Sequence, residues 1–135
     1  MAYDPDNIFA NIIRGDAPAY KVEEDERTLS FLDIMPQSDG HTLVVPKEAA
    51  EDLLTISPEG LAAVTRQTQR IARAIDIAFR PDGIMVAQLN RAAAGQTVFH
   101  LHFHVIPRQT GDGIGIHARD RAAPDKLEEN ADKIR

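Results

Sequence analysis

Three histidines, His100, His102 and His104, stand at every second position of the segment FHLHFHV, which covers residues 99–105. Successive side chains of a β-strand point to opposite faces of the sheet. A strand here therefore places the three imidazoles on one face and Leu101 and Phe103 on the other, in the core. A solvated sheet face usually carries threonine, lysine and glutamate, so three imidazoles in register indicate a chemical role.

One such role is metal binding, because imidazole is the commonest metal ligand in proteins. A rise of about 3.3 Å per residue separates the backbones of His100 and His104 by about 13 Å, which is too far for both to share one metal. His100 and His102 could still chelate a metal together with His41, which begins another predicted strand. That arrangement leaves one histidine of the row without a function.

Nucleophilic catalysis accounts for the whole row better. A neutral imidazole, with an ordinary pKa of about 6.5, is a competent nucleophile near pH 7 if an acceptor such as a backbone carbonyl holds its other nitrogen. Flanking histidines can donate hydrogen bonds to anionic oxygens and can move protons. Phosphoryl chemistry suits this arrangement, because its catalysis depends on positioning and on charge stabilisation.

The elements that must position these histidines are predicted by caps, prolines and apolar spacing. A first short helix follows a cap at Asp6 or Asn7 and stops at Gly15, and the longest helix starts after Ser57. We expect helices or helical turns at residues 8–14, 49–54, 58–80 and 125–135. Strand-like segments lie at residues 20–25, 28–34, 41–46, 84–89 and 98–106. Strands grouped around one long helix predict an α+β fold with an antiparallel sheet.

Composition limits the class of protein further. The chain has 135 residues, a net charge of −6 and no cysteine. These values predict one domain without disulfides or cysteine-ligated zinc, and they argue against general nucleic-acid binding. The first twenty residues hold no apolar run long enough for a signal peptide, and no segment approaches a membrane span. A cytoplasmic protein without a membrane partner is therefore expected.

The segment AGQTVFHLHFHVIPR, residues 94–108, resembles the signature of the histidine-triad (HIT) family, in which three histidines alternate with apolar residues. The upstream block at residues 7–47 is similar to the N-terminal half of that family. The resemblance implies one HIT domain over residues 1–135, with a core at about 7–108 and a C-terminal tail at 109–135. It implies an antiparallel sheet of about five strands with one long and one short helix, usually as a two-fold homodimer.

The resemblance also implies a role for individual residues. His102 corresponds to the nucleophile that attacks an α-phosphorus, and the backbone carbonyl of His100 corresponds to the group that orients it. His104 corresponds to a phosphate-contacting histidine, and His41 to a fourth histidine of the proton network. Asp33 corresponds to the ribose ligand, which suits its two acceptor oxygens. The other nucleotide-binding positions are Asn90, Gln96 and Thr97, and an apolar base pocket at Ile8, Phe9, Ile12, Ile34 and Leu43.

The implied activity is hydrolysis or transfer at the α-phosphate of a purine nucleotide, either a nucleoside phosphoramidate or a dinucleoside polyphosphate. It requires no cofactor and no metal. Some family members carry cysteines of a structural zinc site where this chain has Asn7 and Ala10, so that site is expected to be absent. His117 matches no catalytic position and is expected in solvent. The alternative is a purine-nucleotide-binding regulatory module with little turnover.

Overall fold

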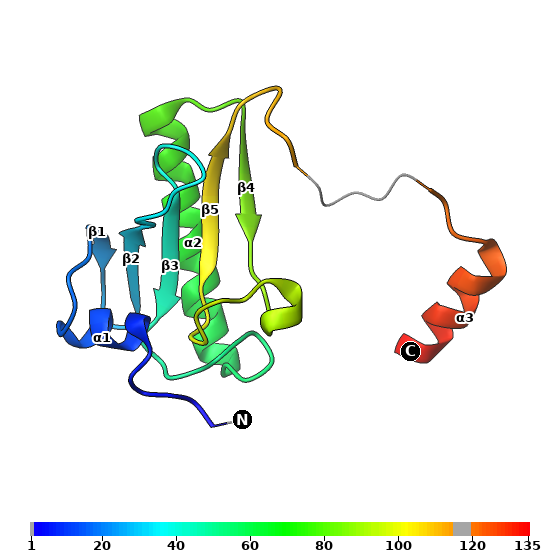
Figure 1. The fold of residues 1–135 in the computed structure, drawn as a ribbon, viewed down its shortest axis with the longest axis horizontal. Coiled ribbons are helices and arrows are strands. Elements are labelled where there is room, and N and C mark those ends of the chain that lie inside the picture. Colours follow the sequence, from blue (N-terminus) through cyan, green and yellow to red (C-terminus); the bar gives the residue numbers. More distant parts are fainter. Residues whose placement is uncertain (1, 115–119) are drawn as a thin grey trace.

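The computed structural model describes residues 2–114 and 120–135, and in it five strands form one antiparallel sheet in the order β1-β2-β3-β5-β4 (Figure 1). The α+β class with one short and one long helix is confirmed, with a third helix near the C-terminus. His117 lies outside the described residues. The elements are α1 (Ile8–Arg14), β1 (Lys21–Glu24), β2 (Thr28–Leu32), β3 (Thr42–Pro46), α2 (Pro58–Phe79), β4 (Gly83–Ala87), the 3-10 turn η1 (Ala92–Ala94), β5 (Phe103–Arg108) and α3 (Pro124–Ile134).

The two helices of the core begin at the caps that the sequence predicts. The side chain of Asn7 accepts a hydrogen bond from the Ala10 N–H, and α1 ends at Gly15 in the left-handed conformation. Ser57 accepts from the Gly60 N–H at the start of α2. Each cap satisfies one of the backbone donors that a helix N-terminus leaves without an intrahelical partner.

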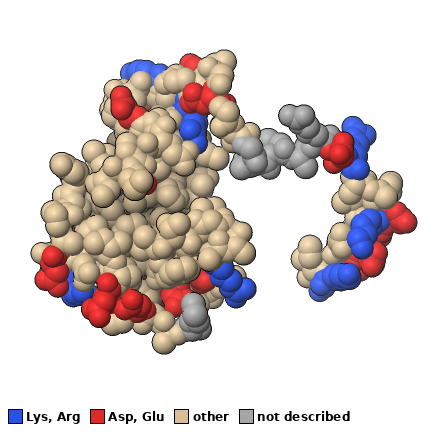
Figure 2. All heavy atoms as spheres, viewed as in Figure 1, with Lys and Arg blue, Asp and Glu red and all other residues tan. Residues whose placement is uncertain are grey.

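The sheet separates two apolar clusters. On one face, Val64, Ile71 and Ile75 of α2 form a cluster with Val44, Leu101 and Val105. On the other face, α1 contributes to a cluster made of Phe9, Ile12, Leu29, Phe31, Leu43 and Val45. Figure 2 shows this second face toward the viewer, with few charged side chains in its middle and acidic and basic side chains mainly at its two ends. A face with so few charged side chains suits an apolar ligand group.

The histidine segment differs from the single strand predicted at 98–106. Strand β5 begins only at Phe103, so His104 lies in the strand while His100 and His102 precede it. The ladder stops because the carbonyl of His100 accepts from a side chain and the N–H of Leu101 donates to Ala50, outside the sheet. The predicted alternation holds for Leu101, which belongs to the cluster on the α2 face, and for His102 and His104, which line a pocket on the other face; His100 does not line that pocket.

The segment before α2 and the C-terminal helix α3 lie outside the sheet. Residues 51–55 form a bend and a turn where residues 49–54 were expected to form helical turns, because the Asp52 carboxylate accepts from the backbone N–H groups of Leu54 and Thr55. Helix α3 lies away from the sheet (Figure 1), and its apolar residues Leu127 and Ile134 are exposed. Over the residues that are described, no helix combines the length and apolar character needed to cross a membrane.

Candidate active site

A pocket of about 450 Å³ opens on the face of the sheet opposite α2. Nine residues predicted for the site line it: Ile8, Phe9, Ile12, Asp33, Ile34, Leu43, Thr97, His102 and His104. All five expected base-pocket residues are among them. The lining is mostly apolar with a few polar groups at one side, which is the usual composition of a small-molecule site.

His102 lines the pocket with one ring nitrogen fixed by the backbone and the other without a hydrogen-bond partner among the described residues. Its Nδ1 lies 2.7 Å from the carbonyl oxygen of His100, and its ring packs edge-on against Phe9 at 4.9 Å between centroids. Because a carbonyl oxygen only accepts, Nδ1 carries the proton and Nε2 keeps its lone pair. Burial lowers the pKa of His102, against the raising effect of the hydrogen bond to His100. The ring is therefore neutral and nucleophilic at Nε2 at pH 7.

His41 and His104 form a second set of fixed imidazoles. The backbone N–H of Gln37 donates to Nδ1 of His41 at 3.1 Å, which leaves the proton of the neutral His41 ring on Nε2. That Nε2 lies 3.0 Å from Nδ1 of His104 and donates to it. His104 therefore carries its own proton on Nε2. Since His104 lines the pocket and its ring centroid is 5.0 Å from that of His102, a donor stands beside the nucleophile.

Asp33 connects the pocket to this pair. One of its oxygens accepts from the backbone N–H of Met35 at 2.9 Å, and the other lies 3.5 Å from Nε2 of His41. Its side chain is only about one-fifth exposed, and it lines the pocket. The carboxylate therefore has remaining acceptor capacity at the pocket wall, while its charge raises the pKa values of His41, His102 and His104 in opposition to burial.

His100 lies behind the pocket wall. Its ring is 1% exposed, its Nε2 lies 2.7 Å from the carbonyl oxygen of Pro46, and its Nδ1 lies 2.6 Å from the hydroxyl of Tyr3. Burial lowers the pKa of His100, so this ring is neutral as well. The backbone carbonyl, not the imidazole, is what His100 presents to His102.

Gln96 and Asn90 lie outside the pocket lining. Gln96 is buried, its Oε1 accepts from the N–H of Arg91, and its Nε2 donates to the carbonyls of Glu51 and Val98. Asn90 accepts from the backbone N–H of Leu53. In this arrangement both side chains support the loop before the histidines, and their expected contacts with a nucleotide stay predictions.

Ligand geometry for a metal exists at one place in the described ranges 2–114 and 120–135. Atoms of Asp33, His41 and His104 lie within 4.8 Å of one another. However, the Gln37 N–H places the proton of the neutral His41 ring on the nitrogen that would have to ligate. The set considered from the sequence, His100 and His102 with His41, is not brought together, since both ring nitrogens of His100 already have partners. This geometry favours a proton network over a metal cage.

Several residues that line the pocket could not be predicted from the sequence. The turn after α1 supplies Ala17, Pro18 and Ala19 to the pocket, and no residue type in it indicates a ligand. Met35 lines the rim and is 82% exposed, beside Ile34 at 79%. Exposed apolar side chains at a pocket mouth are typical of ligand sites, but their exposure is known only from the structure.

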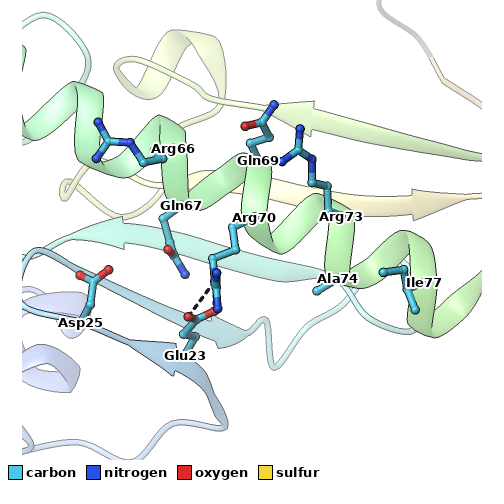
Figure 3. A pocket seen from close by; sticks show the side chains of 9 residues that line it. All are labelled: Glu23, Asp25, Arg66, Gln67, Gln69, Arg70, Arg73, Ala74 and Ile77. Carbon is cyan, nitrogen blue, oxygen red and sulfur yellow. Dashed lines mark hydrogen bonds and ion pairs between the residues drawn. The ribbon is translucent and has the colours of Figure 1, made fainter.

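A wider groove lies on the other side of the sheet, between α2 and β1, with a volume of about 760 Å³ (Figure 3). Arg66, Arg70 and Arg73 of α2 are among the residues that line it, and Figure 3 shows Arg70 directed at Glu23. The Nε of Arg70 donates to Glu23 at 2.8 Å. None of the predicted site residues lines the groove, so the histidine pocket is the candidate active site.

Comparison with known proteins agrees with this fold. The HIT domain family matches residues 14–111, so the chain belongs to the HIT family. A crystal structure of a Hit-like protein from Bartonella henselae is 48% identical, with a TM-score of 0.82, and the alignment covers 98% of this chain and 97% of that one. The chain is also 39% identical to adenosine 5′-monophosphoramidase hnt1 of Schizosaccharomyces pombe over 81% of this chain and 80% of the relative. It is 36% identical to adenylylsulfatase HINT3 of Arabidopsis thaliana, over 96% of this chain and 66% of the relative.

Burial of the four histidines predicts how stability depends on pH. Their pKa values are lowered in the folded protein and return to about 6.5 on unfolding. Below about pH 6.5 the unfolded chain thus binds more protons, so the free energy of unfolding falls as pH decreases. We expect Tm to be constant between about pH 8 and 7 and to drop steadily from about pH 6.5 to 5. Thermal unfolding followed by circular dichroism checks this, and a Tm that rises as pH falls through that range would contradict it.

Proposed function

We propose that this protein cleaves the bond between the α-phosphate of a purine nucleotide and its leaving group, through a covalent nucleotidyl intermediate on His102. The observation that carries the proposal is the hydrogen bond from His102 Nδ1 to the His100 carbonyl, which leaves Nε2 unprotonated in an apolar pocket. The named activities of the fission yeast and Arabidopsis relatives, both nucleotide-cleaving, support the same class of reaction.

In the first step, Nε2 of His102 attacks the α-phosphorus, a P–N bond forms, and the bond to the leaving group breaks. In a phosphoramidate the leaving group is an amine, which takes up a proton from the solvent as it departs; in a dinucleoside polyphosphate it is a nucleoside phosphate, which departs as an anion. In the second step, water attacks the α-phosphorus and gives up a proton to the solvent, the P–N bond breaks, and nucleoside monophosphate is released. Nε2–H of His104 is placed to donate to the phosphate oxygens, whose charge develops in both steps.

The remainder of the pocket suits the nucleoside. Its apolar lining, which includes Phe9 and Leu43, can enclose a purine, and the free acceptor of Asp33 can bind ribose hydroxyls. No proposed step needs a metal, because the imidazoles supply the nucleophile and the donor. The proposed reaction therefore uses only side chains of this protein as catalytic groups.

A substrate panel tests the proposal. An adenosine phosphoramidate and diadenosine polyphosphates are each incubated with the protein, with and without a chelator, and release of AMP is measured. Metal-independent release from either substrate supports the proposal and identifies which of the two substrate classes the protein cleaves. Tight AMP binding without release from any substrate would instead favour a nucleotide-binding module. Activity that is lost with the chelator and restored by metal would contradict the metal-independent mechanism.

We further infer that the protein forms a homodimer through the β4 edge of the sheet. β4 ends the strand order, so one of its edges has no neighbouring strand among residues 2–114 and 120–135. Val86 on β4 is an exposed apolar residue. Such surfaces commonly pair across a two-fold axis. Light scattering at micromolar concentration is expected to give twice the chain mass of 14.9 kDa, and the mass of a single chain would contradict the inference.

A further inference from the structure

Tyr3, near the N-terminus, contacts a residue of the candidate site that is 97 positions away in the sequence. Its hydroxyl lies 2.6 Å from Nδ1 of His100, and its ring meets the His100 ring edge-on at 5.6 Å between centroids. The pocket lining does not include Tyr3. Tyr3 therefore contacts His100 from outside the pocket.

The N-terminal segment is held in the position that this contact needs. The guanidinium of Arg14 donates to the carbonyl of Pro5 at 2.6 Å, and the side-chain amide of Asn7 donates to the carbonyl of Asp4 at 2.7 Å. Both bonds attach residues just after Tyr3 to α1 or to its cap. Because that backbone is already ordered, placing the phenol costs less conformational entropy.

The direction of each hydrogen bond follows from chemistry. The Pro46 carbonyl only accepts, so Nε2 of His100 carries the proton and Nδ1 is the acceptor. The Tyr3 hydroxyl therefore donates to Nδ1. Together, the two bonds hold one tautomer and one orientation of the His100 ring, and the backbone of the same residue holds His102.

We propose that Tyr3 is a positioning residue of this site: its hydroxyl fixes the His100 ring and, with it, the backbone carbonyl that orients His102. The proposal rests on the proposed function for its kinetic consequence. Without the hydroxyl, Nδ1 of His100 becomes a buried acceptor lacking its partner, and either water enters or the ring reorients. The attacking nitrogen then occupies its productive orientation for a smaller fraction of the time, which lowers kcat.

Tyr3→Phe removes only the oxygen and keeps the ring that packs on His100. We expect about a tenfold decrease in kcat with KM within about twofold, because the lost hydrogen bond acts on positioning and not on the nucleotide. Tyr20→Phe is the matched control: it makes the same change at the other tyrosine, which is 70% exposed, and it should behave as wild type. Equal kcat values in Tyr3→Phe and Tyr20→Phe would overturn the proposal.

A second measurement needs no substrate. Long-range ¹H–¹⁵N spectra of the imidazoles report which ring nitrogen carries the proton. In wild type and Tyr20→Phe we expect the Nε2–H form of His100 and the Nδ1–H form of His102, and in Tyr3→Phe a mixture at His100 with shifted His102 signals. Unchanged signals at both histidines in Tyr3→Phe would overturn the proposal, whatever the kinetics.

The two measurements also separate this proposal from the proposed function. If the wild type turns over no substrate of the panel, the proposed function fails. The positioning role is then decided by the spectra alone: shifted His102 signals in Tyr3→Phe would support it, and unchanged ones would overturn it.

Discussion

His102→Asn is expected to lower turnover by about 10⁴-fold or more while nucleotide binding changes by no more than about twofold. Asparagine can still donate to the His100 carbonyl from roughly the place of Nδ1, but it has no nucleophilic nitrogen to replace Nε2. The intermediate therefore cannot form. The apolar lining that binds the base is not altered by the substitution.

Steady-state AMP release and calorimetric titration with AMP measure the two quantities. His104→Asn and His100→Asn are the comparison variants, and each should be slowed less than His102→Asn. The first removes a donor beside the nucleophile and the second removes a ring that supports its carbonyl, but both leave the attacking nitrogen in place. Substantial activity in His102→Asn would reject this residue as the nucleophile.

Asp33→Asn is expected to weaken nucleotide binding by about 10- to 100-fold and to slow the chemical step much less. The amide oxygen can keep the hydrogen bond from the Met35 N–H, so the turn is preserved. The negative charge at the pocket wall is lost, and with it the charge-assisted bonds to ribose hydroxyls. Because the charge of Asp33 raises the pKa of His102, its removal lowers that pKa further and leaves the nucleophile unprotonated.

A 2′-deoxy substrate provides the control for this assignment. Wild type should lose affinity when the 2′-hydroxyl is absent, whereas Asp33→Asn should lose much less, since the contact has already been weakened. Equal losses in the two proteins would show that Asp33 does not bind the ribose. Its 3.5 Å approach to His41 would then be its main interaction.

The parts of the fold that were predictable are those specified by local signals. Asn7 and Gly15 delimit α1, and Ser57 starts α2, because capping and left-handed geometry depend on the residue itself. The predictions that were wrong failed because side chains form hydrogen bonds with the backbone. Residues 49–54 were expected to be helical, but the Asp52 side chain takes the backbone donors there. The strand was expected to start before His100, but side-chain bonds to the backbone interrupt it.

The candidate site was also only partly predictable from the sequence. The alternation of histidines with Leu101 and Phe103 was sufficient to place His102 and His104 on the pocket side of the sheet. Which nitrogen each ring leaves unprotonated was not predictable, because it depends on remote groups such as the N–H of Gln37 and the hydroxyl of Tyr3. Those contacts form only when segments distant in the sequence pack together.

The measurement that tests the central claim most directly is identification of the intermediate. Wild type mixed with a radiolabelled substrate and quenched in acid within milliseconds is expected to carry a nucleotidyl group, and peptide mapping is expected to locate it on His102. His102→Asn, treated identically, should carry none, and His104→Asn should still be labelled on His102. An adduct on His41, His100 or His104, or no adduct in a wild type that turns over the same substrate, would contradict covalent catalysis by His102.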